Sequence, residues 1–78
     1  MLIHATDLQD AKLIELQRRG DDRGFFARTF CADEFAAAGL PTQFVQQNMS
    51  FSAEKGTLRG MHWQRAPHGE DKLIRCMS

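Results

Sequence analysis

Short runs of alternating apolar and polar residues follow one another along the chain, separated by turn-forming residues. Residues 12–17 carry three apolar side chains, and residues 25–30 are rich in aromatic and β-branched side chains. Such runs are typical of short strands, and the polar cluster at residues 18–22 predicts a turn between them. In the second strand, Phe26 and Arg28 would lie on the same face.

One segment, residues 32–38, has a helical character instead. Asp33 and Glu34 stand where the first turn of a helix favours negative charge, and apolar residues follow them. Gly39 and Pro41 then supply a stop, because glycine ends helices well and proline cannot continue them. The sequence thus predicts one short helix.

Period-two alternation returns in residues 43–52, 58–64 and 72–77, and each run predicts a strand. A compact turn at residues 53–56 would join the first two strands, and a loop at residues 67–71 would lead to the third. About five short strands with one helix indicate a mainly-β fold, an antiparallel sandwich or barrel rather than a parallel sheet.

Two residues on these strands are candidates for chemistry. Adjacent strands would bring His62 and Lys72 close together, placing a base that titrates near neutrality beside a fixed cation. That pair suits chemistry next to a carbonyl. The spacing alone leaves two other interpretations open: His62 as a buried, hydrogen-bonded histidine, and Lys72 as a lysine that protects a strand edge.

Composition limits the partners and the cellular setting. Ten basic and ten acidic residues among 78 give no net charge, which argues against a nucleic-acid or membrane-surface partner held by bulk electrostatics. The N-terminus lacks the basic-then-apolar pattern of a signal peptide, and no apolar run is long enough to span a membrane. We therefore expect a cytoplasmic protein.

The cysteines and histidines indicate no metal. Cys31 and Cys76 match no metal-binding spacing, and the three histidines, His4, His62 and His68, are widely separated. Reduced cysteines are the expectation, with a single structural disulfide as the less favoured alternative.

A chain of 78 residues makes at most one small domain with a small core. The run at residues 72–77 ends only where the sequence ends, and the predicted sheet needs more strands to cover its edges. We therefore expect a truncated chain.

Several motifs, taken in order, resemble one family. They are Asp21-Asp22-Arg23-Gly24-Phe25-Phe26, Phe30, Glu34-Phe35, Phe44-Val45-Gln46-Gln47-Asn48-Met49-Ser50, Leu58-Arg59-Gly60-Met61-His62-Trp63-Gln64 and Lys72-Leu73. Together they are similar to the N-terminal portion of dTDP-4-dehydrorhamnose 3,5-epimerases, over nearly the whole chain. The resemblance implies that residues 1–78 are the N-terminal part of a single cupin-type jelly-roll domain.

The resemblance also implies an activity. It would be epimerisation, without a cofactor, at C3 and C5 of a dTDP-linked 4-keto-6-deoxyhexose, on the route to dTDP-L-rhamnose, by a homodimer. His62 matches the family's catalytic base, and Lys72 matches the lysine that faces the keto oxygen, where a cation stabilises the enolate. In the family, the aspartate behind the histidine and the reprotonating tyrosine lie further along, beyond Ser78, and this chain contains no tyrosine.

The remaining site residues are carried over in the same way. Arg23 and Arg59 match contacts to the nucleotide and its diphosphate, a role that suits guanidinium groups. Without the resemblance they would be a turn arginine and a solvated strand arginine. Gln46 and Asn48 match polar contacts to the diphosphate or the sugar.

Two aromatic residues complete the carried-over set. Phe26 would pack against the nucleoside, with a core phenylalanine as the alternative, and His68 would be a neighbour of the substrate. Arg28 departs from the family, in which many members have a glutamate that helps recognise the base. Arginine cannot accept a hydrogen bond from a base N–H, so the nucleotide preference is less secure than the fold.

Two other functions remain open at this point. The missing tyrosine and aspartate favour a non-catalytic nucleotide-sugar binding or dimerisation fragment of the same fold. Isomerisation of the keto group by a related cupin sugar enzyme is the third possibility, although such enzymes usually arrange their histidines differently.

Overall fold

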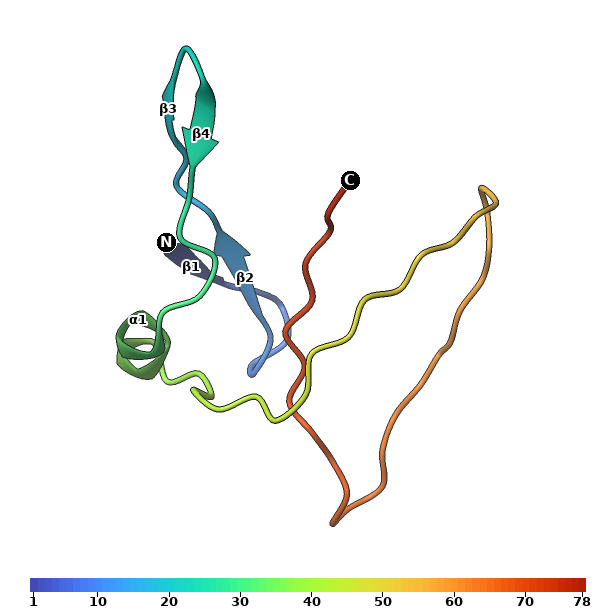
Figure 1. The fold of residues 1–78 in the computed structure, drawn as a ribbon. Coiled ribbons are helices and arrows are strands. Elements are labelled where there is room, and N and C mark those ends of the chain that lie inside the picture. The colour runs from blue at the N-terminus through green and yellow to red at the C-terminus, as the bar shows by residue number, and fades with distance from the viewer. The chain divides into compact units, whose positions relative to one another are not determined.

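A computed structural model describes residues 1–78 and divides them into two compact units, Met1–Val45 and Gln46–Ser78. All four strands and the helix belong to the first unit (Figure 1). The second unit contains neither a helix nor a strand.

The first unit opens with an antiparallel hairpin of β1 (Leu2–Ala5) and β2 (Lys12–Glu15). Ile3 lies opposite Ile14, a pair of β-branched side chains that suits a half-buried strand pair. β2 confirms the strand predicted at residues 12–17, in a shorter form. β1 was not predicted, because its four residues become a strand only through pairing with β2.

A hydroxyl group closes the loop of this hairpin. Thr6 Oγ1 donates to the carbonyl oxygens of Leu8 (3.1 Å) and Ala11 (2.8 Å) and accepts a hydrogen bond from the Leu8 N–H. Small hydroxyl side chains make such local bonds with nearby backbone groups and so stabilise turns.

The second hairpin pairs β3 (Arg19–Asp21) with β4 (Gly24–Phe26). The predicted turn at residues 18–22 is therefore wrong in its position, since most of it is β3 and the turn itself is Asp22-Arg23. Gly24, the first residue of β4 after the turn, has φ +132°, a backbone conformation that glycine adopts without strain. The predicted strand at residues 25–30 ends at Phe26.

The short helix α1 (Ala32–Ala37) confirms the predicted helix and carries the core. Phe35 is only 1% exposed, and its ring meets those of Phe30 and Phe44 edge to face, with centroids 4.8 and 6.5 Å away. Phe30 and Phe44 also contact each other at 5.9 Å. Such edge-to-face contacts add to the free energy gained from burying the rings.

The helix ends where the sequence predicts. Gly39 has φ +75°, its N–H donates to the Ala36 carbonyl, and the Leu40 N–H donates to the Phe35 carbonyl. These two bonds form a Schellman motif, which satisfies carbonyls that the helix leaves without partners.

Residues 46–78 run as extended segments joined by turns near residues 53–56 and 66–68 (Figure 1). Both turns agree with the sequence, and backbone bonds from Thr57 N to Glu54 O and from His68 N to Arg65 O close them. The strands predicted at residues 43–52, 58–64 and 72–77 are wrong, because none of these segments pairs with another. A strand requires a ladder of inter-strand hydrogen bonds, which alternation alone cannot supply.

All side chains of the second unit are exposed, including large apolar ones such as Met61 (99%), Leu58 and Trp63. The fold class is nevertheless as expected, namely mainly β and antiparallel with one short helix. Two separate two-stranded sheets do not form a sandwich, so the jelly roll stays a prediction. No helix has the length and apolar character needed to cross a membrane.

Candidate functional site

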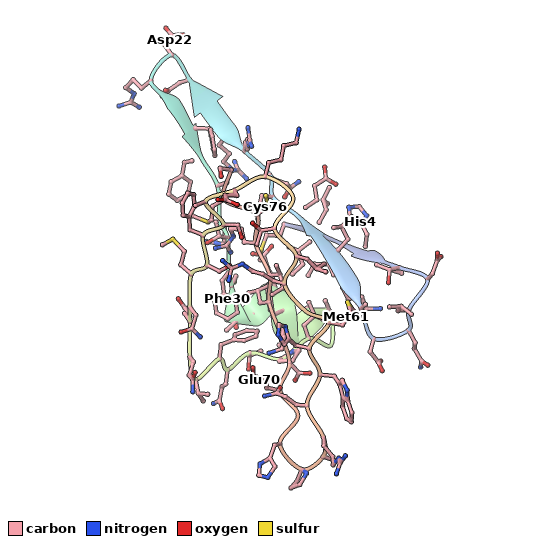
Figure 2. The ribbon with its side chains drawn as sticks, turned by 90° about the vertical axis from the view of Figure 1, so that its right-hand side faces the viewer. His4, Asp22, Phe30, Met61, Glu70 and Cys76 are labelled. Carbon is pink, nitrogen blue, oxygen red and sulfur yellow. The ribbon has the colours of Figure 1, made fainter.

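Arg23 lies at the tip of the β3–β4 hairpin, next to the labelled Asp22 (Figure 2). Its backbone N–H donates to Asp21 Oδ1 at 2.9 Å, and its Nη2 donates to Asp21 Oδ2 at 2.8 Å. The Arg23 side chain is 90% exposed. The Arg23 guanidinium and then its backbone N–H hold the pKa of Asp21 below its usual range. The carboxylate thus fixes the backbone and the side chain of Arg23 together.

Phe26, at the end of β4, is 75% exposed and borders a cavity of about 310 Å³. Its side chain is not part of the core, so the core interpretation of Phe26 is wrong. The cavity is otherwise lined by Met1, Gln17, Arg19, Ala27, Arg28 and Glu34.

One carboxylate organises the polar side of this cavity. Glu34 accepts hydrogen bonds from the Met1 ammonium at 3.2 Å and from Arg28 Nη1 at 3.4 Å. The ammonium also donates to Gln17 Oε1 at 3.1 Å. The hydrogen bond from the ammonium lowers the pKa of Glu34, and burial opposes that shift only in part. Arg28, which departs from the family pattern, is therefore held by a carboxylate.

Arg59 reaches back across the turn at residues 53–56. Its Nε donates to Ser52 Oγ and its Nη2 donates to the Phe51 carbonyl, both at 2.9 Å. The turn itself is closed by Thr57, whose hydroxyl and N–H both bond to the Glu54 carbonyl. Arg59 is thus not merely solvated, because two neutral acceptors fix its guanidinium.

His62 is exposed and makes no hydrogen bond within residues 1–78. The interpretation of His62 as a buried, hydrogen-bonded histidine is therefore wrong. Gly60 lies beside it with φ +103°, and a Cβ at that position would come 3.4 Å from His62 Nδ1. Only glycine adopts this backbone conformation without strain, and its missing side chain leaves the ring unobstructed.

Lys72 donates to Glu70 in the same segment, and His68 lies in the turn before them. Because the predicted strands are not formed, no ladder of hydrogen bonds places Lys72 beside His62, and their pairing stays a prediction.

Gln46 and Asn48 are exposed on the extended segment before the turn at residues 53–56. Their roles stay predictions as well.

Residues 1–78 contain no group of three or more histidine, cysteine or acidic side chains that could hold a metal ion. Cys31 is half-buried, Cys76 is exposed, and both are free thiols, so the structural disulfide is excluded in this structure.

The residues that hold the candidate cations were not predicted from the sequence. Asp21 precedes Arg23 by two positions, Glu70 precedes Lys72 by two, and Ser52 precedes Arg59 by seven. A carboxylate two positions before a cation at a turn was a readable signal for Asp21 and Glu70. The contact from Ser52 depends on how the intervening turn folds.

The fold and these residues define a class of protein: a mainly-β chain with exposed cations held by nearby acceptors and an exposed histidine. A family model described as dTDP-4-dehydrorhamnose 3,5-epimerase matches residues 5–78. The chain belongs to this family, and the resemblance of the motifs is confirmed.

Named relatives agree with the family model. The dTDP-4-dehydrorhamnose 3,5-epimerase of Escherichia coli (strain K12) is 43% identical over 97% of this chain, and that of Methanothermobacter thermautotrophicus is 45% identical over 92%. A dTDP-4-dehydrorhamnose 3-epimerase of Streptomyces niveus is 37% identical over 78% of the chain.

These alignments cover 41%, 38% and 30% of the three relatives, so the chain spans about two fifths of the length of the first. No solved structure matched the chain.

Proposed function

We propose that this chain provides the base and the anion-binding cations of a nucleotide-sugar 3,5-epimerase acting on dTDP-4-keto-6-deoxyglucose. The observation that carries the proposal is the family match over residues 5–78, which includes all of the candidate site residues. The exposed His62 and the held cations Arg23, Arg59 and Lys72 have the chemistry that this reaction needs.

The reaction inverts a carbon next to a ketone. His62, as a neutral imidazole, takes the proton of the C–H bond, and the electron pair of that bond forms the enolate. The Lys72 ammonium faces the enolate oxygen and lowers the free energy of the developing charge. A proton returned to the opposite face of the same carbon completes the inversion. Family resemblance assigns that proton to a tyrosine, and residues 1–78 contain none, so the second step needs a group outside them.

The substrate's nucleotide would be held by the other carried-over residues. Arg23 and Arg59 bind diphosphate oxygens, since guanidinium groups form charge-assisted, often bidentate bonds with phosphate. Gln46 and Asn48 add polar contacts, and the exposed ring of Phe26 packs against the nucleoside. His68 lies near the substrate.

The same proposal includes the cupin-type jelly roll, a homodimer and the cytoplasmic location. Open strand edges and exposed apolar side chains support this part of the proposal. Both two-stranded sheets have open edges, and residues 46–78 expose large apolar side chains that further strands would cover.

A second candidate function is nucleotide-sugar binding or dimerisation without catalysis, and the absence of tyrosine favours it. A third outcome concerns the position of the reaction, because one relative is named as a 3-epimerase.

Hydrogen exchange from D₂O distinguishes a 3,5-epimerase, a 3-epimerase and a non-catalytic binding protein. Protein made from the complete reading frame that contains this chain is given dTDP-4-keto-6-deoxyglucose in D₂O, and deuterium at C3 and C5 is measured by NMR. Exchange at both carbons is the expected result. Exchange at C3 alone would make the protein a 3-epimerase, and dTDP binding without exchange would make it a binding protein.

A further inference from the structure

The three candidate cations of the site are held by acceptors of different charge. Arg23 and Lys72 are each bonded to a carboxylate, Asp21 and Glu70 respectively. Arg59 is bonded to a hydroxyl and a backbone carbonyl, which are neutral. An anion that approaches Arg23 or Lys72 meets a like charge beside the cation, whereas one that approaches Arg59 meets an uncompensated positive charge.

The bonds to Arg59 also select which edge of its guanidinium is free. The group has five N–H donors in one plane, and the bonds to Ser52 and Phe51 engage Nε and Nη2 on its side edge. Both N–H groups of Nη1 and the second of Nη2 remain, and one N–H from each of these two nitrogens forms the end-on edge. That edge can donate two parallel hydrogen bonds to phosphate oxygens.

A hydrogen-bonded turn connects Arg59 to the residues that hold its guanidinium. Ser52 and Arg59 lie on either side of residues 53–56, where Gly56 has φ +83°. Thr57 closes that turn through two bonds to the Glu54 carbonyl. A long side chain tied back in this way loses less conformational entropy when a ligand binds, and this gain is the benefit of preorganisation.

We propose that Ser52 is a positioning residue, which holds the Arg59 guanidinium with its end-on edge available to the diphosphate of the substrate. The inference rests on the proposed function, because a dTDP-linked sugar is the ligand that would bring a diphosphate to Arg59. Ser52 acts through Arg59 and does not take part in the proton transfers.

The test is a double-mutant cycle in the full protein, with dTDP as the probe in isothermal titration calorimetry and dTDP-4-keto-6-deoxyglucose as the substrate in kinetics. Losing one orienting hydrogen bond to a charged group weakens binding on the order of tenfold. Ser52→Ala should therefore raise the Kd for dTDP and the KM by about tenfold while kcat stays within about twofold. Ser52→Thr keeps the hydroxyl and should stay near wild type. Ser78→Ala is the matched control and should change neither constant.

The cycle gives the decisive comparison. In an Arg59→Ala background, Ser52→Ala should have no further effect, because the residue through which Ser52 acts is gone. Additive losses would overturn the positioning role, as would a Ser52→Ala variant with unchanged Kd and KM or with a lowered kcat alone. If the wild-type protein bound no dTDP at all, the proposed function would fail, and the role of Ser52 with it. If wild type bound dTDP and the cycle were additive, only the role of Ser52 would fail.

Discussion

The carboxylate of Asp21 holds both the backbone N–H and the guanidinium of Arg23 at the tip of the β3–β4 hairpin. A candidate substrate-binding cation is thereby fixed to the same residue that shapes the turn. The charge state of Asp21 controls this contact.

The first prediction concerns the pH at which that contact breaks. The pKa of Asp21 is lowered, so its stabilising effect on the hairpin is present above the ordinary aspartate range and is lost as the pH falls through the lowered value. In an NMR titration, the Arg23 amide should shift with a midpoint below that of an ordinary aspartate. Asp21→Asn should abolish this step, and a midpoint above the ordinary range would contradict the assignment.

Glu34 provides a second pH-dependent contact, to the Met1 ammonium and Arg28. Its pKa is also lowered, so the contribution to stability is present at neutral pH and is lost as the pH falls below the ordinary glutamate range. Urea unfolding should show Glu34→Gln to be less stable than wild type at pH 7, with the difference disappearing in acid.

The matched control is Asp33→Asn, in the same first turn of α1, where no hydrogen bond to another side chain is formed. Its effect should be smaller than that of Glu34→Gln. Equal effects would mean that the attraction of acidic side chains to the positive N-terminal end of the helix dipole, and not the ammonium, is responsible.

Phe35 supplies the buried core of the described residues, between Phe30 and Phe44. Truncating a buried phenylalanine typically costs about 3–5 kcal/mol, enough to unfold a chain with so small a core. Phe35→Ala should therefore remove protected amides of α1 in hydrogen exchange of the 78-residue chain. Phe51→Ala, at an 82% exposed phenylalanine, should leave α1 protection unchanged. Loss of protection in both variants would contradict this placement of the core.

Gly60 is predicted to matter through its backbone and its closeness to His62. An alanine would take on the strain of φ +103° and place its Cβ 3.4 Å from Nδ1 of the imidazole. A left-handed backbone costs a non-glycine residue roughly 1–2 kcal/mol, so Gly60→Ala should lower kcat about tenfold in the full protein.

Gly69→Ala is the control for this substitution. A Cβ at Gly69 would meet nothing within 4 Å, and its φ is not in the left-handed range. Its kcat should match wild type. Equal loss in both variants would show that general destabilisation, and not the surroundings of His62, is being measured.

The sequence predicted those elements whose signals are local. The helix, with acidic residues in its first turn and Gly39 at its end, has its boundaries within one residue of the prediction. β2 and the turns near residues 53–56 and 66–68 also follow from local patterns.

Other features depend on pairing between segments. β1 exists because Leu2–Ala5 lies against β2, and β3 exists because Arg19–Asp21 lies against β4. In residues 46–78, apolar and polar side chains alternate strongly, but no other segment pairs with these residues and no strand forms. Hydrogen-bond ladders are properties of two segments, which a pattern along one segment cannot specify.

The same distinction between local sequence signals and contacts made by folding applies to the candidate site. Residue types and spacing identified His62 and Lys72, and family resemblance gave them roles and added Arg23 and Arg59. The acceptors that hold those cations were not predicted: Asp21 and Glu70 each precede their cation by two positions, a local signal, whereas the contact from Ser52 depends on the folded turn. These residue types are common hydrogen-bond acceptors, and these three matter because the fold places them beside the cations.

The most direct test of the account is solvent exchange catalysed by His62→Asn in the full protein. Wild type should incorporate deuterium at C3 and C5 of dTDP-4-keto-6-deoxyglucose in D₂O if His62, as proposed, removes both protons. His4→Asn, which alters the histidine bonded to Glu15 in the first hairpin, should exchange like wild type. His62→Asn should show no exchange above the uncatalysed rate. Undiminished exchange by His62→Asn would contradict the central claim that this histidine is the base.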